Sequence, residues 1–173
     1  KYDLCTVARL EYRKGHHLVL EAISILRNDY KISLKYAILG DGPELSRLKD
    51  LVMKFSLQKQ VDFIHHDISS EKIYKNSSIH IMPTISTPES IEGFGISNVE
   101  AASFGLPCVI SNSGGTPESI GDNGIIVKEN DPKKLVKSII DIFKTYQSYS
   151  RKSYVFAKNF ESKKKIEEYL DNF

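Results

Sequence analysis

The sequence predicts an α/β domain built on a doubly wound, Rossmann-like parallel sheet of about six strands. Short apolar segments alternate with longer helical patterns along the whole chain. Most of the short segments are apolar throughout, as strands covered on both faces are. A length of 173 residues suits a single hydrophobic core. No internal repeat, low-complexity tract or linker interrupts the alternation.

The expected strands are short apolar runs that end before glycine, polar or charged residues. They are residues 4–8, 34–39, 61–64, 79–82, 108–110 and 125–127. Apolar residues at three- and four-residue spacing predict helices between them, over residues 16–30, 44–55 and 132–146. We expect Asp131 to cap the last of these, with Pro132 at its first position. Another helical pattern follows residue 95 and ends near residue 105.

A doubly wound sheet with right-handed crossovers binds its ligands outside the carboxyl ends of the strands, near the point where the strand order reverses. Functional residues should therefore lie directly after strands. Those segments are residues 9–15, 40–43, 65–70, 83–95, 111–117 and 128–131, and several are rich in glycine.

Composition excludes several classes of protein. The net charge of +2 gives no reason to expect nucleic acid or an acidic membrane as the main partner. Cys5 and Cys108 lie far apart in apolar stretches, so they offer no zinc or iron–sulfur spacing and are expected to be buried and reduced. No apolar run approaches the ~20 residues of a membrane-spanning helix. We expect a cytoplasmic protein, with membrane association as an open alternative, and the missing initiator Met suggests an excised piece.

Residues 92–100, with the sequence Glu-Gly-Phe-Gly-Ile-Ser-Asn-Val-Glu, form the most informative segment. Gly93 and Gly95 let the backbone approach a ligand closely, and the free N–H groups near Ile96 and Ser97 form an anion site that fits a diphosphate. The two terminal glutamates are about 12 Å apart at helical rise. They can therefore hold different parts of one extended ligand, such as a hexose and a ribose. The alternative is an ordinary solvent-exposed helix start.

This glutamate pair, seven residues apart and headed by Glu-Gly-Phe-Gly, resembles the signature of retaining GT-B glycosyltransferases of the glycosyl transferases group 1 type. Further similar segments are Val-Ala-Arg-Leu with Lys-Gly at residues 7–15, Gly-Asp-Gly-Pro-Glu at 40–44, and the stretches 101–107 and 114–118. The resemblance implies the C-terminal, donor-binding half of a GT-B fold. Residues 1–159 would form the nucleotide-sugar-binding domain, and residues 160–173 a helix that crosses back to a missing N-terminal domain.

The resemblance also implies roles for individual residues. Arg9 and Lys14 would contact the donor diphosphate, and Glu92 would orient the transferred sugar; these three form the predicted catalytic set. Glu100 would hold the ribose, and Gly93, Phe94, Gly95, Ile96 and Ser97 would complete the donor-binding segment.

Two predicted contacts lie at the edges of this site. Gly40 belongs to a plain strand-to-helix turn and is assigned only to the edge of the nucleotide pocket. His65 and His66 follow the third strand, where the family's nucleobase contacts fall. The family more often has a glycine at the first of these positions, which leaves the nucleobase open.

The implied reaction is the transfer of a hexosyl unit from a UDP-, GDP- or ADP-sugar to a hydroxyl acceptor, lipid-linked or polysaccharide, with retention of configuration. No cofactor or metal is expected, because the chain has no Asp-x-Asp and two cations with a helix dipole can neutralise a diphosphate. The expected partners are the donor and the missing acceptor domain, through which the protein would touch a membrane, and no nucleic acid. The fragment alone is expected to be inactive.

Two rival interpretations stay open. A non-catalytic nucleotide-binding module could share the fold, since a doubly wound sheet alone implies no activity. The second rival is a GT-B-fold enzyme of different chemistry, such as a nucleotide-sugar epimerase or a phosphorylase, and the glutamate pair with Arg9 and Lys14 favours a transferase over both rivals. Glu92 favours a transferase, because a simple nucleotide-binding module has no need of a glutamate that faces the sugar.

Overall fold

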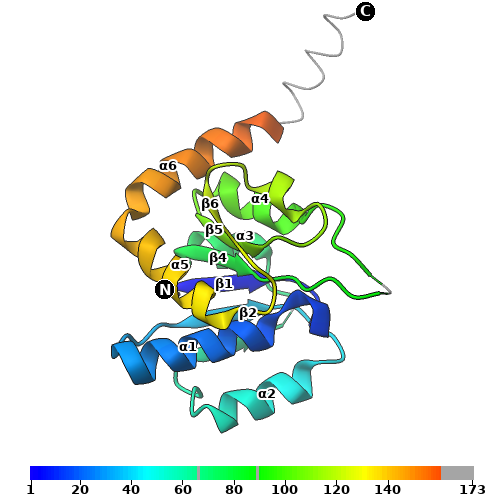
Figure 1. Ribbon diagram of the computed structural model, residues 1–173, viewed down its shortest axis with the longest axis vertical. Helices are drawn as coiled ribbons and strands as arrows, with labels where there is room; N and C mark the ends of the chain where they lie inside the picture. The colour runs from blue at the N-terminus through cyan, green and yellow to red at the C-terminus, as the bar shows by residue number, and fades with distance from the viewer. Residues whose placement is uncertain (66, 89, 161–173) are drawn as a thin grey trace, which may run out of the picture.

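The computed structural model describes residues 1–65, 67–88 and 90–160. Its centre is a six-stranded, entirely parallel sheet with strand order β3-β2-β1-β4-β5-β6. Helices lie on both sides of the sheet (Figure 1). This is the doubly wound arrangement that the sequence predicts, with the strand order reversing between β1 and β4.

The strands are short and mostly buried. Their bounds are Leu4–Val7 (β1), Tyr36–Leu39 (β2), Val61–Ile64 (β3), Ile79–Met82 (β4), Cys108–Ser111 (β5) and Gly124–Val127 (β6). They agree with the predicted runs to within two residues. The largest difference is at β2, which starts at Tyr36. The N–H of the preceding residue, Lys35, donates to the Asp3 carboxylate at 2.7 Å and so does not pair with a neighbouring strand.

The helices are α1 (His16–Tyr30), α2 (Leu45–Lys54), α3 (Ser70–Lys75), α4 (Ile96–Ser103), α5 (Pro132–Lys144) and α6 (Tyr146–Ala157), with short 3₁₀ turns η1 (Tyr12–Lys14), η2 (Thr116–Ser119) and η3 (Lys158–Phe160). The predicted bounds of α1 are confirmed. The Asp131 side chain accepts a hydrogen bond from the Lys134 N–H at 2.9 Å, which confirms the predicted cap of α5. The expectation that this helix runs to residue 146 is wrong, because the chain turns at Thr145 and starts α6.

Each face of the sheet has its own apolar core. On one face α1, α2 and α5 pack through side chains such as Leu20, Leu48 and Ile139. On the other face Ile73, Tyr74 and Ala101 from α3 and α4 cover the sheet. Cys5 and Cys108 lie in this second core as free, buried thiols, as predicted.

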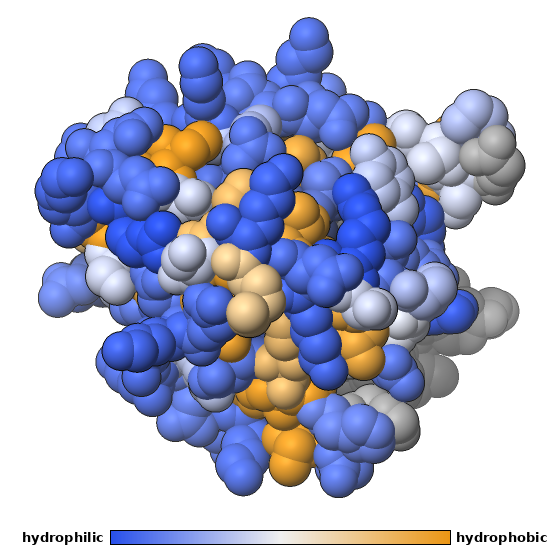
Figure 2. Space-filling view, turned by 90° about the horizontal axis from the view of Figure 1, so that it is seen from below, coloured by the Kyte–Doolittle hydropathy of each residue, from blue (hydrophilic) through white to orange (hydrophobic). Residues whose placement is uncertain are grey.

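Some large apolar side chains reach the surface, among them Met53, Ile91, Ile96 and Val155. The face in Figure 2 is largely hydrophilic, with apolar residues gathered in small patches between polar side chains. Among the residues that the structure describes, no helix is both long and apolar enough to cross a membrane. The predicted crossing helix at residues 160–173 lies outside the described residues apart from Phe160, which ends η3.

Candidate functional site

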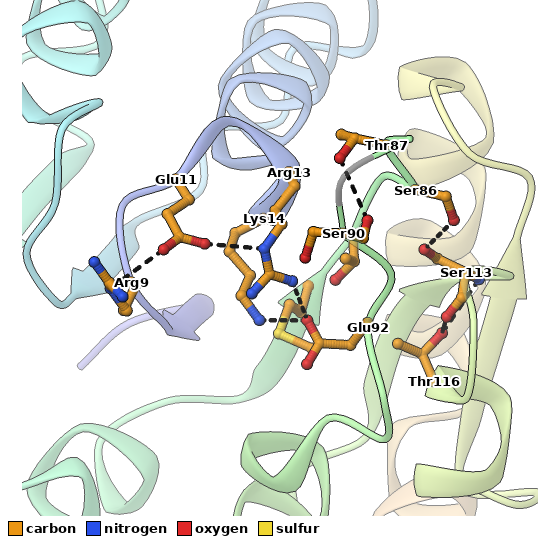
Figure 3. Close-up of polar contacts among 12 residues, drawn as sticks. Arg9, Glu11, Arg13, Lys14, Ser86, Thr87, Ser90, Glu92, Ser113 and Thr116 are labelled. Atoms are coloured by element: carbon orange, nitrogen blue, oxygen red, sulfur yellow. Dashed lines mark hydrogen bonds and ion pairs between the residues drawn. The ribbon is translucent and has the colours of Figure 1, made fainter.

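The loops that follow β1 and β4 meet at the switch point of the sheet, where strand pairing places β1 directly beside β4. The Glu92 carboxylate lies between two cations of η1 (Figure 3). Its Oε2 accepts a hydrogen bond from Arg13 Nη1 at 2.9 Å and another from Lys14 Nζ. Arg13 also donates from Nε to Glu11 at 2.9 Å. One arginine therefore joins two carboxylates across the site.

These charges are partly shielded from water. The side chains of Lys14 and Glu92 are only 12% and 14% exposed. Burial by itself raises the pKa of Glu92, but the hydrogen bonds and positive charges of Lys14 and Arg13 lower that pKa below its ordinary value overall. Glu92 is thus ionised at neutral pH, and the site combines a fixed acceptor with two fixed cations.

A glycine brings the two loops together. Gly15 ends η1 with a left-handed backbone, φ 70°, and starts α1. A Cβ at this position would lie 2.1 Å from the carbonyl oxygen of Pro83, just after β4. The close approach is secured by a hydrogen bond from the Ile85 N–H to the Arg13 carbonyl at 2.7 Å. This close approach places η1 against the segment that carries Glu92.

The same edge of the sheet contains a pocket of about 380 Å³, which we call the switch-point pocket. It is lined by Val7, Ala8, Lys14, Met82, Glu92, Gly93, Phe94, Gly95, Ile96 and Ser97. The N-cap of α4 is Gly95, which has no side chain to bond the first-turn N–H groups. The pocket therefore combines a lysine, a carboxylate and a helix N-terminus, a set suited to an anion attached to a hydroxyl-bearing group.

Most of the predicted donor-binding residues meet in this pocket, but Arg9 does not line it. Its side chain is 75% exposed and pairs with Glu11 at 3.3 Å. Its predicted contact with a diphosphate stays a prediction. Gly40 packs so closely on Ala8 that an added Cβ would lie 2.0 Å from the Ala8 oxygen, which places Gly40 beside the pocket's edge.

The remaining predicted residues lie further out. Glu100 is an exposed residue of α4, and its Oε2 is 3.2 Å from the hydroxyl of Tyr74. His65 follows β3, and its Nδ1 is 3.2 Å from Asp67. His66 lies outside the described residues. The structure leaves the nucleobase contacts of both histidines as predictions.

Sequence reasoning missed several residues that shape the site. Arg13 had one signal, since it is adjacent to Lys14 in a cation-rich loop. Tyr74 had none, because α3 was not predicted. Glu129 lies in the predicted post-strand segment 128–131 without an assigned role, and its carboxylate accepts hydrogen bonds from the N–H and hydroxyl of Ser86 at 3.1 and 2.7 Å. This contact anchors the start of the loop that carries Glu92.

Behind that loop, backbone and buried polar contacts fix its position. The Gly115 N–H donates to the Glu92 carbonyl at 2.9 Å. Asn98, in the first turn of α4, is buried, and its Nδ2 donates to the Ser119 hydroxyl at 2.7 Å. The loop after β5 and η2 therefore hold both the Glu92 backbone and the first turn of α4.

Comparison with known proteins extends these observations. The family model described as Glycosyl transferases group 1 matches residues 1–159. The chain is 33% identical over 144 residues to a phosphatidylinositol N-acetylglucosaminyltransferase subunit of Arabidopsis thaliana, covering 79% of this chain and 30% of that protein. It is 29% identical over 144 residues to the putative colanic acid biosynthesis glycosyltransferase WcaL of Salmonella typhimurium, covering 80% and 35%.

Solved structures with a similar fold have low sequence identity to the chain. The pneumococcal O-GlcNAc transferase GtfA, in complex with UDP and GlcNAc, superposes with a TM-score of 0.84 at 20% identity, over 99% of this chain and 35% of that one. Anabaena Alr3699/HepE, in complex with UDP, gives a TM-score of 0.79 at 19% identity, over 100% and 49%. The chain spans about a third of the length of the Arabidopsis and Salmonella relatives.

Proposed function

The chain belongs to the glycosyl transferases group 1 family, and from that premise we propose that it binds the nucleoside-diphosphate sugar of a retaining, metal-independent hexosyltransferase. The α/β fold predicted for a GT-B glycosyltransferase is confirmed by this membership and by the similar structures. The observation that carries the proposal is the ionised Glu92, held beside Lys14 in a pocket that ends at the N-terminus of α4.

In the proposed reaction, negative charge builds on the departing diphosphate as the glycosyl bond breaks. Lys14, Arg9 and the first-turn N–H groups of α4 stabilise that charge, an electrostatic effect that is usually the largest single catalytic contribution. Glu92 accepts hydrogen bonds from the sugar hydroxyls, and Glu100 accepts them from the ribose. The cations and the helix dipole take the place of a metal ion.

The identities of the donor's nucleotide and of the acceptor are further proposals. GtfA and HepE were solved with UDP, which supports a UDP-sugar as the first donor to test, with GDP- and ADP-sugars as the other candidates. We propose that a further, acceptor-binding domain completes the enzyme and that the acceptor is lipid-linked or a polysaccharide. Peripheral membrane contact through that domain and a cytoplasmic location belong to the same proposal.

A thermal-shift panel of UDP, GDP, ADP and their sugars tests donor binding. A ligand at a hundred times its dissociation constant should add about 2.7 kcal/mol to the free energy of unfolding and raise the melting temperature. A panel in which no nucleoside diphosphate raises the melting temperature more than inorganic phosphate would contradict the proposal.

Three substitutions then separate the ligand's parts by calorimetry. Lys14→Ala and Arg9→Ala should weaken binding of the bare nucleoside diphosphate, with the larger loss for Lys14 because it lines the pocket. Glu92→Gln should weaken binding only when the sugar is attached. If Glu92→Gln leaves sugar-nucleotide binding unchanged, the rival non-catalytic nucleotide-binding module is favoured instead.

A further inference from the structure

The hydroxyl of Tyr74 connects α3 to the side of α4 that carries Glu100. It lies 3.2 Å from Glu100 Oε2 and 3.3 Å from the carbonyl oxygen of Ser97. Both acceptors belong to α4, one to its first turn and one to the turn after it. Tyr74 is itself only 1% exposed. A buried residue thus reaches an exposed carboxylate near the switch-point pocket.

The ring of Tyr74 is held from two sides. It stacks on Phe104 with ring centroids 5.6 Å apart and an interplanar angle of 25°. It meets His80 edge-on at 5.9 Å and 76°. Because these contacts fix the ring, they also fix where the hydroxyl points.

The hydroxyl of Tyr74 keeps its proton at neutral pH and can therefore donate it. Burial first, and then the neighbouring Glu100 carboxylate, raise the pKa of Tyr74 above its ordinary value. The hydroxyl has one proton for two acceptors, and a hydrogen bond to a carboxylate is stronger than one to a backbone carbonyl. The proton therefore goes to Glu100.

An exposed glutamate on a helix otherwise samples several rotamers, and ordering it costs free energy when a ligand binds. The bond from Tyr74 occupies Oε2 and leaves Oε1 as an acceptor. We propose that Tyr74 is a positioning residue that holds Glu100 in the rotamer from which it accepts hydrogen bonds from a ribose diol. This inference rests on the proposed function, because it assigns the ribose to Glu100.

The chain offers a matched control for testing this role. Tyr36 is also buried, and its hydroxyl is 2.7 Å from the Thr6 hydroxyl, inside β1 and β2. Tyr74→Phe and Tyr36→Phe each remove one buried hydroxyl, but only the first touches Glu100. The affinities of both variants for UDP and for 2′,3′-dideoxy-UDP are measured by calorimetry, beside those of the unaltered chain.

We expect Tyr74→Phe to weaken UDP binding about five-fold, the size of one ordinary hydrogen bond. It should leave dideoxy-UDP binding unchanged, which also shows that the variant is folded. Tyr36→Phe should change neither affinity. In a double-mutant cycle, adding Tyr74→Phe to Glu100→Gln should cost nothing further, because the two residues act through one contact.

Equal losses for UDP and dideoxy-UDP in Tyr74→Phe would overturn the positioning role, as would additive losses in the cycle. In either case binding of UDP by the unaltered chain would leave the proposed function standing. Failure of the unaltered chain to bind UDP, GDP or ADP would instead remove the proposed function and the role of Tyr74 with it.

Discussion

Glu92 has two cationic partners, Arg13 and Lys14, and the proposed function gives them different roles in ligand binding. Lys14 lines the switch-point pocket and is the cation that a diphosphate would meet. Arg13 does not line it, but it donates to both Glu92 and Glu11 at 2.9 Å. If Lys14 turns to the diphosphate of the proposed donor, Arg13 would be left to hold the Glu92 carboxylate toward the sugar.

Replacing Arg13 should therefore affect the sugar rather than the nucleotide. We expect Arg13→Gln to weaken binding of a UDP-sugar by about ten- to a hundred-fold, because a hydrogen bond to a charged group contributes roughly 1.5–3 kcal/mol. Binding of UDP alone should change much less. Lys144→Gln is the control, since Lys144 pairs with Asp141 on α5 at 3.6 Å and does not line the pocket. Calorimetry with both ligands checks the difference, and equal losses for UDP and the UDP-sugar would assign Arg13 to the phosphates.

The lowered pKa of Glu92 makes stability depend on pH. The folded pKa lies below the ordinary value of 4.5, so the unfolded chain takes up a proton first as the pH falls. The stabilisation by Glu92 is present above pH 4.5 and is lost as the pH falls through the folded pKa. Glu92→Gln should lower the free energy of unfolding at neutral pH and reduce its fall in the acid range. Denaturant unfolding from pH 7 to pH 3 measures both, and an unchanged slope below pH 4.5 would contradict the ion pairs.

At the scale of elements, the sequence predicts a helix best where apolar side chains recur at a regular spacing. The bounds of α1 are predictable because its apolar residues recur at helical spacing and Gly15 precedes them. The six residues of α3 are too few to show a period. In α6 only Ser153 and Ala157 are buried, so no apolar stripe distinguishes it. Short and mostly exposed helices depend on tertiary contacts that a pattern of residues does not contain.

The turn from η1 into α1 depends on a single glycine. Gly15→Ala should destabilise the chain by about 1–3 kcal/mol from its left-handed backbone alone, with a further cost from the contact with Pro83. Gly93→Ala is the matched control, because a Cβ at Gly93 meets nothing within 4 Å. Thermal unfolding compares the two variants. Equal stability of both would show that the loops after β1 and β4 are not tightly packed.

At the scale of the whole molecule, the site forms only when β1 and β4 have paired in the sheet. Residues 7–15 and 82–97 come together because β1 pairs with β4 across more than seventy residues of sequence. The sequence could place Lys14 and Glu92 at one edge, since both follow strands. It could not show which side chains of each loop face the other loop, so the bond between Arg13 and Glu92 was not predictable.

The chain alone should bind a donor without transferring its sugar. It spans about a third of its relatives' length, and the contacts proposed for the switch-point pocket all concern the donor. Orienting two substrates can supply about 7–11 kcal/mol of a barrier, so a chain that orients only one should show at most slow donor hydrolysis. A labelled UDP-sugar with an acceptor extract measures this, beside a glycosyltransferase that contains both domains. Robust transfer by the 173-residue chain would show that it is a complete enzyme.

If the proposed function holds, the bond between Lys14 and Glu92 also makes the switch-point pocket selective. Inorganic phosphate could bind Lys14 only by drawing it away from Glu92, which would leave that carboxylate beside a second negative charge. A nucleotide sugar brings hydroxyl donors for Glu92 together with the anion for Lys14. The proposed site should therefore bind a nucleotide sugar more tightly than the bare nucleoside diphosphate, and inorganic phosphate more weakly than either, because only the nucleotide sugar offers groups to both side chains.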